Sequence, residues 1–373
     1  MADVPQPTSL TQDAERACVR IDAAAIAANV ATMASAAPSS QCCAVVKADG
    51  YGHGALTAAR AALAGGATWL AVATAAEATE LRAAGIEARL LILGPLTLPE
   101  LEAALVADAD IVAWTDALLD AAAALGGARI HVKLDTGMGR LGTRDPEEAL
   151  ALLRRCVTTP GLDAVGAMTH FATADELGDR FFPEQLARFA AWIDRAREVV
   201  PEVIAHAANS AAILRDADSH FDLVRPGVSI YGLDPFGADP VGRELTPALA
   251  LSATVGAVRP IAKGESAGYG RRWVAPADGY IGVIPVGYAD GWRRGLTNAA
   301  DALIEGQRRP LVGTVSMDSV AVDLGTHPVA VGTEAVLIGT QGEERILVED
   351  LARTLGTINY EITCGLGPRL PRR

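Results

Sequence analysis

Apolar runs and amphipathic segments alternate through the first two thirds of the chain. Short, almost uninterrupted apolar runs are typical of strands buried on both faces of a parallel sheet. They lie at 42–47, 69–73, 89–93, 111–114, 130–134, 164–168, 203–207 and 223–225. Between most of them apolar residues recur at helical spacing. This spacing predicts helices at 54–63, 76–83, 98–107, 116–125, 147–156, 182–199 and 210–215.

A strand-then-helix alternation of this kind predicts a parallel sheet with crossover helices. Eight strands with their helices over roughly 200 to 250 residues have the size of a (β/α)8 barrel, a TIM-like α/β fold. An open doubly wound sheet also remains possible, because an error of one or two strands in the count would leave the sheet open.

After about residue 234 the pattern changes to β-branched runs separated by turns. We predict strands at 251–258, 280–286, 311–315, 320–322 and 335–338, with a single helix at 348–355. The change falls in a Gly/Pro/Asp-rich linker at 232–242. The sequence therefore predicts a flexible leader at 1–17, a barrel at 18–242 and a mainly-β domain at 243–373.

Charge and cysteine content exclude several classes of partner and site. The formal net charge is -13, with a pI near 5.0, which argues against nucleic acid or an anionic membrane as a partner. The first residues lack a signal-peptide pattern, and the uncharged stretch between Arg60 and Glu77 is too short to span a membrane. The five cysteines show no CxxC spacing, which favours reduced thiols in the cytoplasm over disulfides or a metal site.

Candidate chemistry begins with AVVKADGYGHG at 44–54, where a predicted strand ends on Lys47 and a glycine-rich turn follows. Barrels keep their catalytic groups at the carboxyl ends of their strands. A partly desolvated amine there favours the neutral, nucleophilic form that Schiff-base chemistry with a carbonyl or pyridoxal phosphate needs. For a lone lysine, an ordinary strand end with a turn would be the better interpretation, so the rest of the chain must decide.

Further polar residues follow the other predicted barrel strands. They are Lys133 with Asp135 and Arg140, His170, Asn209 with Ser210, and Arg225 with Gly227. The last two groups lie in the loops after strands seven and eight, where barrels often bind phosphate. Taken singly, Ser210 could be a helix N-cap, Gly227 a turn residue after Pro226, and His170 a buried, hydrogen-bonded histidine. Their convergence on one face of the barrel favours a functional site.

Nine motifs together carry a resemblance to the alanine racemase family of fold-type III pyridoxal phosphate enzymes. They are VKADGYGHG (46–54), KLDTGMGRLG (133–142), MTHFATAD (168–175), HAANSAA (206–212), RPGVSIYG (225–232), SAGYGRRW (266–273), PVGYADG (285–291), GTVSMD (313–318) and INYEITC (358–364). The resemblance runs almost end to end. It implies a barrel with a β domain, in agreement with the hydrophobic pattern.

The resemblance also implies a role for each matching residue. Lys47 matches the Schiff-base lysine and first catalytic base, and Tyr269 matches the second base, which the other subunit supplies. The matches to cofactor contacts are Arg225 at the pyridine nitrogen, His170 linked to it, Asn209, and the phosphate ligands Tyr51, Ser210, Gly227, Val228 and Tyr360. The matches on the substrate side are Arg140, Met317, Asp318 and the entry-gate residue Tyr288, with Lys133 at a position that is often N-carboxylated.

The implied activity is a two-base interconversion of L- and D-alanine through an external aldimine of pyridoxal phosphate, which supplies D-alanine for peptidoglycan. It requires a homodimer with composite active sites. A serine racemase or a broader substrate range remains open, because methyl and hydroxymethyl side chains can differ by about 1–3 kcal/mol in one or two contacts. Two alternatives are a related fold-type III decarboxylase and a non-catalytic barrel protein that carries pyridoxal phosphate. The former would need a Gly-rich phosphate loop and a Cys/Asp motif, which the sequence does not show, and the latter would lack the β domain that the sequence predicts. Gly50 and Gly365 depart from the family's usual residues.

Overall fold

The computed structural model describes residues 15–373, which divide into two compact units. One unit, here called the barrel unit, comprises Ala23–Phe236 and Val241–Thr246. The other, here called the β unit, comprises the residues up to Asp22, Gly237–Pro240 and Pro247–Arg373. The predicted flexible leader at 1–17 falls mostly on residues 1–14, which lie outside the described residues.

Among the described residues, the barrel unit is built on an eight-stranded parallel sheet with the order β8-β7-β6-β5-β4-β3-β2-β9. Its strands are β2 (Gln41–Val45), β3 (Trp69–Val72), β4 (Arg89–Ile92), β5 (Ala109–Ala113), β6 (Ala128–Lys133), β7 (Leu162–Met168), β8 (Ile204–His206) and β9 (Leu223–Val224). Backbone hydrogen bonds join the two ends of this order. Asp222 N donates to Ala205 O at 3.0 Å, and Arg225 N donates to Ala208 O at 2.9 Å. The sheet is therefore closed, which confirms the barrel and excludes the open sheet.

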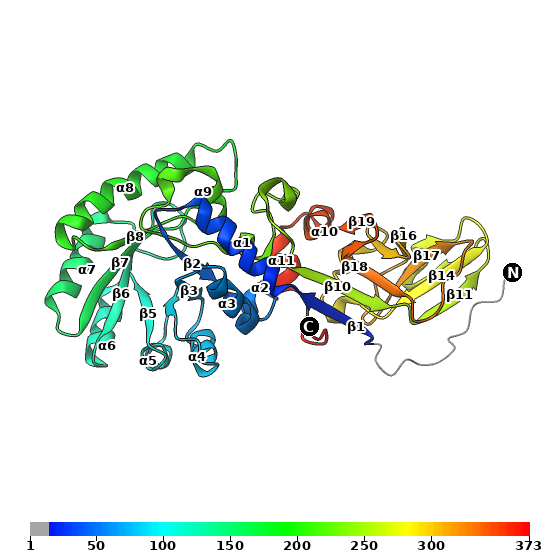
Figure 1. Cartoon of the computed structure of the whole chain (residues 1–373), viewed down its shortest axis with the longest axis horizontal. Coiled ribbons are helices and arrows are strands. Elements are labelled where there is room, and N and C mark those ends of the chain that lie inside the picture. Colours follow the sequence, from blue (N-terminus) through cyan, green and yellow to red (C-terminus); the bar gives the residue numbers. More distant parts are fainter. Residues whose placement is uncertain (1–14) are drawn as a thin grey trace. The chain divides into compact units, whose positions relative to one another are not determined.

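Helices surround this sheet, as the blue-to-green part of the chain shows (Figure 1). They are α1 (Ala23–Ala36), α3 (Ala55–Ala64), α4 (Ala75–Ala83), α5 (Leu98–Val106), α6 (Asp116–Ala124), α7 (Pro146–Thr158), α8 (Phe181–Val199) and α9 (Ser210–Arg215). The predicted helices lie within two residues of these bounds. Helix α1 was not predicted, because its alanine-rich sequence contains no charged residue and so shows little contrast between its faces. Every helix within residues 15–373 is too short or too polar to cross a membrane.

The β unit is built on antiparallel strand pairs. They are β1 (Ala17–Ile21), β10 (Leu249–Thr254), β18 (Glu334–Gln341), β15 (Asp301–Ile304), β16 (Gln307–Val312), β17 (Val320–Gly325), β14 (Gly279–Ile284) and β11 (Ala257–Ile261) in sheet order, with β19 (Glu344–Ile346) beside β18. A separate hairpin joins β12 (Ser266–Ala267) to β13 (Trp273–Val274), and two helices follow, α10 (Val348–Leu355) and α11 (Asn359–Cys364). The predicted second, mainly-β domain architecture is thus confirmed.

Two features of the β unit differ from the predicted ranges. The predicted strand at 251–258 is two strands, β10 and β11, because the chain leaves the β10 ladder at Val255, which donates instead to Thr333 O. Strand β1 pairs with β10, with Val19 opposite Leu251, so residues 17–22 belong to the β unit although the predicted barrel range began at residue 18. The chain therefore enters the barrel unit at Ala23.

Candidate active site

Lys47 lies two residues after the end of β2, at the carboxyl end of the barrel sheet. The strand ends at Val45, two residues earlier than predicted, and Lys47 opens the short segment α2 (Lys47–Tyr51). Residues 48–51 have φ values of 53°, 51°, 61° and 53°, all in the left-handed region, and only the third of them is glycine. A left-handed residue other than glycine costs about 1–2 kcal/mol. Strain of this kind persists only where the surrounding structure enforces it, often at functional sites.

Two carboxylates hold this left-handed turn in place. Glu77 Oε1 accepts a hydrogen bond from Ala48 N at 2.7 Å, and its Oε2 accepts from Ala73 N and Thr74 N at 2.7 and 3.1 Å. Asp49 Oδ1 accepts from Ala55 N, the first residue of α3, at 2.8 Å. The backbone that carries Lys47 is therefore tied to α3 and α4.

Arg225, directly after β9, is buried and anchored by four hydrogen bonds. One terminal nitrogen donates to His206 Nδ1 at 2.8 Å. The other donates to Thr169 O, Ala207 O and His170 Nδ1 at 2.8, 3.0 and 3.4 Å. Burial lowers the pKa of Arg225 to about 10, so the group remains a cation at neutral pH. The predicted link between Arg225 and His170 is present, and His206 forms a shorter contact that was not predicted.

Positive charge gathers around the end of β6. Burial, together with the charges of Arg225, Arg140 and Lys47, lowers the pKa of Lys133 to about 8. Burial together with the same cations holds the pKa of His170 well below its usual value. The barrel thus brings together four cationic side chains that the sequence placed after three different strands. Such a cluster fits an anionic ligand, because charge-assisted hydrogen bonds to phosphate or carboxylate are among the strong ones.

The loops after β8 and β9 meet at Ser210. Its Oγ accepts from Gly227 N at 2.9 Å and from Ser229 N at 3.3 Å, which leaves its own proton free to donate. Asn209 is the N-cap of α9, since its side chain accepts from Ala212 N at 3.0 Å. The interpretation of Ser210 as the N-cap is therefore wrong.

Gly227 has a steric reason to be glycine. A Cβ atom there would lie 2.6 Å from Tyr51 Oη, so the bare backbone admits the tyrosine hydroxyl. Val228 follows as the first residue of a 3-10 turn, and the buried Ser229 Oγ has no hydrogen-bond partner among the described residues. The hydroxyls of Tyr51, Ser210 and Ser229, collected near buried cations, fit the phosphate of pyridoxal phosphate.

The remaining predicted residues lie in the β unit, where three large side chains are exposed. Tyr269, Met317 and Tyr288 are 73%, 52% and 43% exposed. Hydrogen bonds to the segment 314–317 hold their backbone together: Thr314 Oγ1 donates to Tyr269 O at 2.7 Å, Tyr288 N donates to Ser316 O at 3.0 Å, and Ala289 N donates to Met317 O at 3.0 Å. Asp318 beside them forms an ion pair with Arg369 at 2.8 Å, and Tyr360 lies on α11.

Comparison with known proteins identifies the family. Residues 21–235 match the model of the alanine racemase N-terminal domain, and residues 248–373 match that of the C-terminal domain. The chain belongs to the alanine racemase family. The alanine racemases of Geobacillus kaustophilus and Thermobifida fusca are each 43% identical to it, over 95% of this chain and 93% and 96% of theirs. The chain is accordingly an isomerase, and the family is pyridoxal phosphate-dependent.

Solved alanine racemases share the whole architecture. The structure from E. faecalis superposes with a TM-score of 0.91 at 36% identity and covers 98% of this chain and 100% of its own. That from Bacillus anthracis, solved with bound L-Ala-P, gives 0.88 at 36% identity over 96% and 94% of the two chains. These matches support the fold of both units of this racemase.

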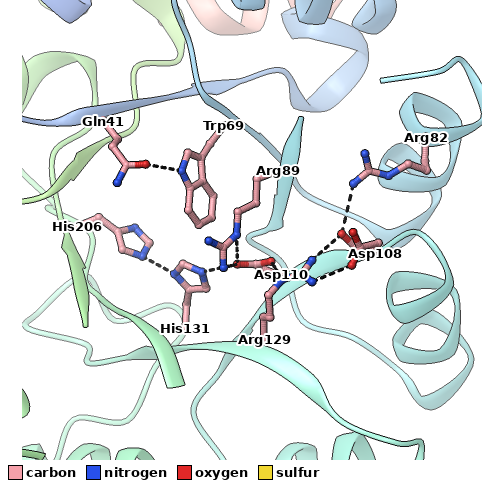
Figure 2. Close-up of polar contacts among 9 residues, drawn as sticks. All are labelled: Gln41, Trp69, Arg82, Arg89, Asp108, Asp110, Arg129, His131 and His206. Atoms are coloured by element: carbon pink, nitrogen blue, oxygen red, sulfur yellow. Dashed lines mark hydrogen bonds and ion pairs between the residues drawn. The ribbon is translucent and has the colours of Figure 1, made fainter. Parts of the chain in front are cut away.

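Several residues that shape the site were not predicted. Glu77 supports the turn after Lys47, and His206 contacts Arg225. Behind His206 lie His131 and Asp110, which Figure 2 shows in a line from β8 across β6 to β5. Glu77 follows Thr74 at capping-box spacing, and His206 opens the motif HAANSAA, so both positions carried a local signal. The sequence around His131 and Asp110 contained no local signal of this kind.

Proposed function

We propose that this alanine racemase interconverts L- and D-alanine at the carboxyl end of its barrel, with pyridoxal phosphate as the cofactor. The position of Lys47 is the main observation behind this proposal. It stands on a strained, clamped turn beside the buried cation Arg225 and the cations Lys133 and Arg140. The relatives named alanine racemase and the B. anthracis structure with bound L-Ala-P support alanine as the substrate.

Each part of the cofactor has a candidate partner. Lys47 would carry it covalently, and Arg225, supported by His170, would face its pyridine nitrogen. The candidates for its phosphate are Tyr51, Ser210, Gly227, Val228 and Tyr360, with Asn209 capping the helix that begins at Ser210. Bound pyridoxal phosphate withdraws electrons from the amino acid and makes its Cα proton acidic. Arg225 can only donate hydrogen bonds, so it orients the ring nitrogen without serving as a base.

Racemisation requires a base on each face of the substrate, because the Cα proton leaves one face and returns on the other. Lys47 Nζ would serve one face. Tyr269 Oη of a second copy of the chain would serve the other, and its exposure in a single chain supports that role. Arg140 would hold the substrate carboxylate by charge-assisted hydrogen bonds. Met317 and Asp318 of the second copy would line the substrate side, with Tyr288 at the entrance.

Lys133 would act as an N-carboxylated lysine. With its pKa lowered to about 8, a substantial fraction of its amine is neutral near physiological pH and can add carbon dioxide. The carbamate is an anion, which would offset the buried charges of Arg225 and Arg140. This modification would turn an unfavourable buried cation into a hydrogen-bond acceptor for Arg140.

In the cell, this racemase would supply D-alanine for peptidoglycan from the cytoplasm. The five cysteines are free thiols in the structure, four of them buried, in keeping with a reducing compartment. Racemisation of serine or of a broader range of amino acids is the second candidate that an assay must separate.

Borohydride reduction and peptide mapping test the proposal directly, because the chain has only three lysines, Lys47, Lys133 and Lys263. We expect the reduced cofactor on Lys47 alone. Lys47→Ala should abolish both the adduct and racemisation, whereas Lys263→Ala, at an exposed position, should change neither. An adduct on another lysine would contradict the assignment. Racemisation rates across L-amino acids then define the substrate.

A further inference from the structure

A chain of polar side chains, His206, His131 and Asp110, crosses the interior of the barrel unit (Figure 2), and Arg225 contacts its His206 end. His206, the last residue of β8, accepts from Arg225 at its Nδ1, and its Nε2 lies 2.8 Å from His131 Nδ1 on β6. His131 Nε2 lies 3.1 Å from Asp110 Oδ2 on β5. His206, His131 and Asp110 are all fully buried. The chain thus links the candidate active site to the amino-terminal ends of the strands.

The two ends of this chain determine the direction of every hydrogen bond in it. A guanidinium can only donate, so His206 Nδ1 accepts and its Nε2 carries the proton. His131 Nδ1 must then accept, so its Nε2 also carries the proton and donates to Asp110. Burial keeps the pKa of His206 well below its usual value, and it also lowers the pKa of His131, so both imidazoles are neutral.

The strands around His131 are shaped to admit its ring. The pairing of β6 with β7 shifts by one residue between Ile130 and His131, as a β-bulge does where it redirects a side chain. A Cβ atom on Gly166 would lie 1.9 Å from His131 Nδ1, so the ring passes over bare backbone. Trp69 packs edge-on against the ring, with centroids 5.7 Å apart.

Asp110 is the fixed anionic end of the chain. Arg89 lies 2.9 Å from its Oδ2, and Arg129 forms an ion pair with its Oδ1. Burial alone would raise the pKa of Asp110, but the contacts with His131, Arg129 and Arg89 hold it below its usual value. The carboxylate therefore stays charged and keeps accepting from His131. Barrel interiors are usually filled by branched apolar side chains, so a buried polar chain here needs a reason.

We propose that Asp110 and His131 are positioning residues for Arg225. They hold His206 in the tautomer whose Nδ1 lone pair faces the guanidinium, so that Arg225 keeps one orientation toward the cofactor ring. This inference rests on the proposed function, in which Arg225 faces the pyridine nitrogen.

The first test needs no substitution in the enzyme that is measured. Nitrogen NMR of the holoenzyme labelled with 15N-histidine distinguishes the two neutral tautomers and the imidazolium. We expect His206 and His131 to carry a proton only on Nε2 at neutral pH. Spectra of His206→Gln and His131→Gln assign the two signals among the six histidines of the chain. An Nδ1-protonated tautomer or an imidazolium at either position would overturn the proposal.

The second test uses two substitutions at His131 that differ in which contact they keep. In His131→Asn the amide oxygen is bonded to Cγ, as Nδ1 is, so it can still accept from His206. In His131→Gln the amide occupies the place of Nε2, so it can reach Asp110 but leaves the Nε2 proton of His206 without an acceptor. We expect His131→Gln to lower kcat about tenfold at unchanged KM and to shift the His206 signal. His131→Asn keeps the acceptor for His206 but loses the contact with Asp110, so it should lower kcat less and shift that signal less.

Equal effects of the two substitutions on kcat and on the His206 signal would show a merely structural role and overturn the proposal. Arg225→Lys separates this outcome from a failure of the proposed function. If Arg225→Lys retained full racemase activity, the role of Arg225 at the cofactor would be wrong. If Arg225→Lys lost activity while His131→Asn and His131→Gln had the same kcat and the same His206 signal, only the positioning roles of His131 and Asp110 would be rejected.

Discussion

Lys133 is a buried amine in cationic surroundings. Its pKa of about 8 in the folded chain lies below its ordinary value of 10.5. Between these two values the unfolded chain binds more protons than the folded chain, so stability rises as the pH rises from 8 to 10.5. Below pH 8 the buried cation destabilises the folded chain by its full amount. A pKa difference of this size between the folded and unfolded chain corresponds to about 3 kcal/mol in the free energy of unfolding. Carboxylation would remove this penalty by replacing the cation with an anion.

Replacing this amine with an apolar side chain of similar length tests the penalty. In buffer free of carbon dioxide at pH 7, we expect Lys133→Met to raise the free energy of unfolding by about 1–3 kcal/mol. The gain should shrink as the pH approaches 10. Urea unfolding at several pH values measures it, with Lys263→Met at an exposed position as the control. A gain that does not change with pH would contradict the depressed pKa of Lys133. In bicarbonate buffer, where Lys133 of the wild-type protein becomes carboxylated, its free energy of unfolding should no longer lie below that of Lys133→Met.

Among the secondary-structure elements, the left-handed turn after β2 is shaped most directly by its neighbours. Residues 48–51 adopt positive φ values, and a Cβ atom on Gly50 would lie 2.9 Å from the Cβ of Ala58 on α3. Glu77 on α4 accepts from three backbone amides and so joins the turn to the end of β3. The position of Lys47 therefore depends on contacts made by α4.

The role of the Glu77 carboxylate can be separated from that of an ordinary surface charge on α4. Glu77→Gln keeps the length of the side chain but turns one acceptor oxygen into a donor that faces backbone N–H groups. We expect the free energy of unfolding to fall by about 1–3 kcal/mol, the cost of amides left without an acceptor, and racemase kcat to fall with it. The control is Glu80→Gln, an exposed position of α4. Equal stability and kcat in the two variants would contradict a role for Glu77 in holding Lys47.

For the whole molecule, the residues proposed for the active site are divided between the two compact units. The barrel unit holds Lys47 and Arg225, whereas the β unit holds Tyr269, Met317 and Tyr288 on an exposed surface. Exposed large side chains gathered on one surface often mark a protein interface. In a two-fold dimer each copy could lend this surface to the barrel of the other, which would make two equivalent sites.

Mixing two inactive variants tests this assembly. Lys47→Ala and Tyr269→Phe should each be inactive alone. After subunit exchange the mixture should recover activity, since one of the two sites in each hybrid dimer contains both intact bases. The double variant carried on one chain and exchanged with Lys47→Ala is the control, because no site of that hybrid holds both bases. No recovery despite demonstrated exchange would mean that one chain supplies both bases. Cα-deuterium exchange should show that Tyr269→Phe impairs one enantiomer far more than the other.

Local patterns determined most of the fold. Apolar runs such as 69–73 and 89–93 predicted β3 and β4 within one residue, because a strand buried on both faces shows its burial in its own sequence. The glycine-rich segment after Lys47 and the RPG segment at Arg225 likewise marked the candidate site, and their motifs identified the family. These signals are short in range, so one sequence was enough to find them.

Tertiary structure decided the features that depend on distant partners. Strand β1 belongs to the β unit because its ladder partner is β10, more than two hundred residues away, and Asn209 rather than Ser210 caps α9 because Ser210 Oγ binds the amides of the next loop. Asp110 stood just before the predicted strand at 111–114 and His131 inside the one at 130–134, and nothing in the sequence marked either residue. Only the ladder order of the barrel sheet places β5, β6 and β8 near one another, so that Asp110 contacts His131 and His131 contacts His206, the partner of Arg225.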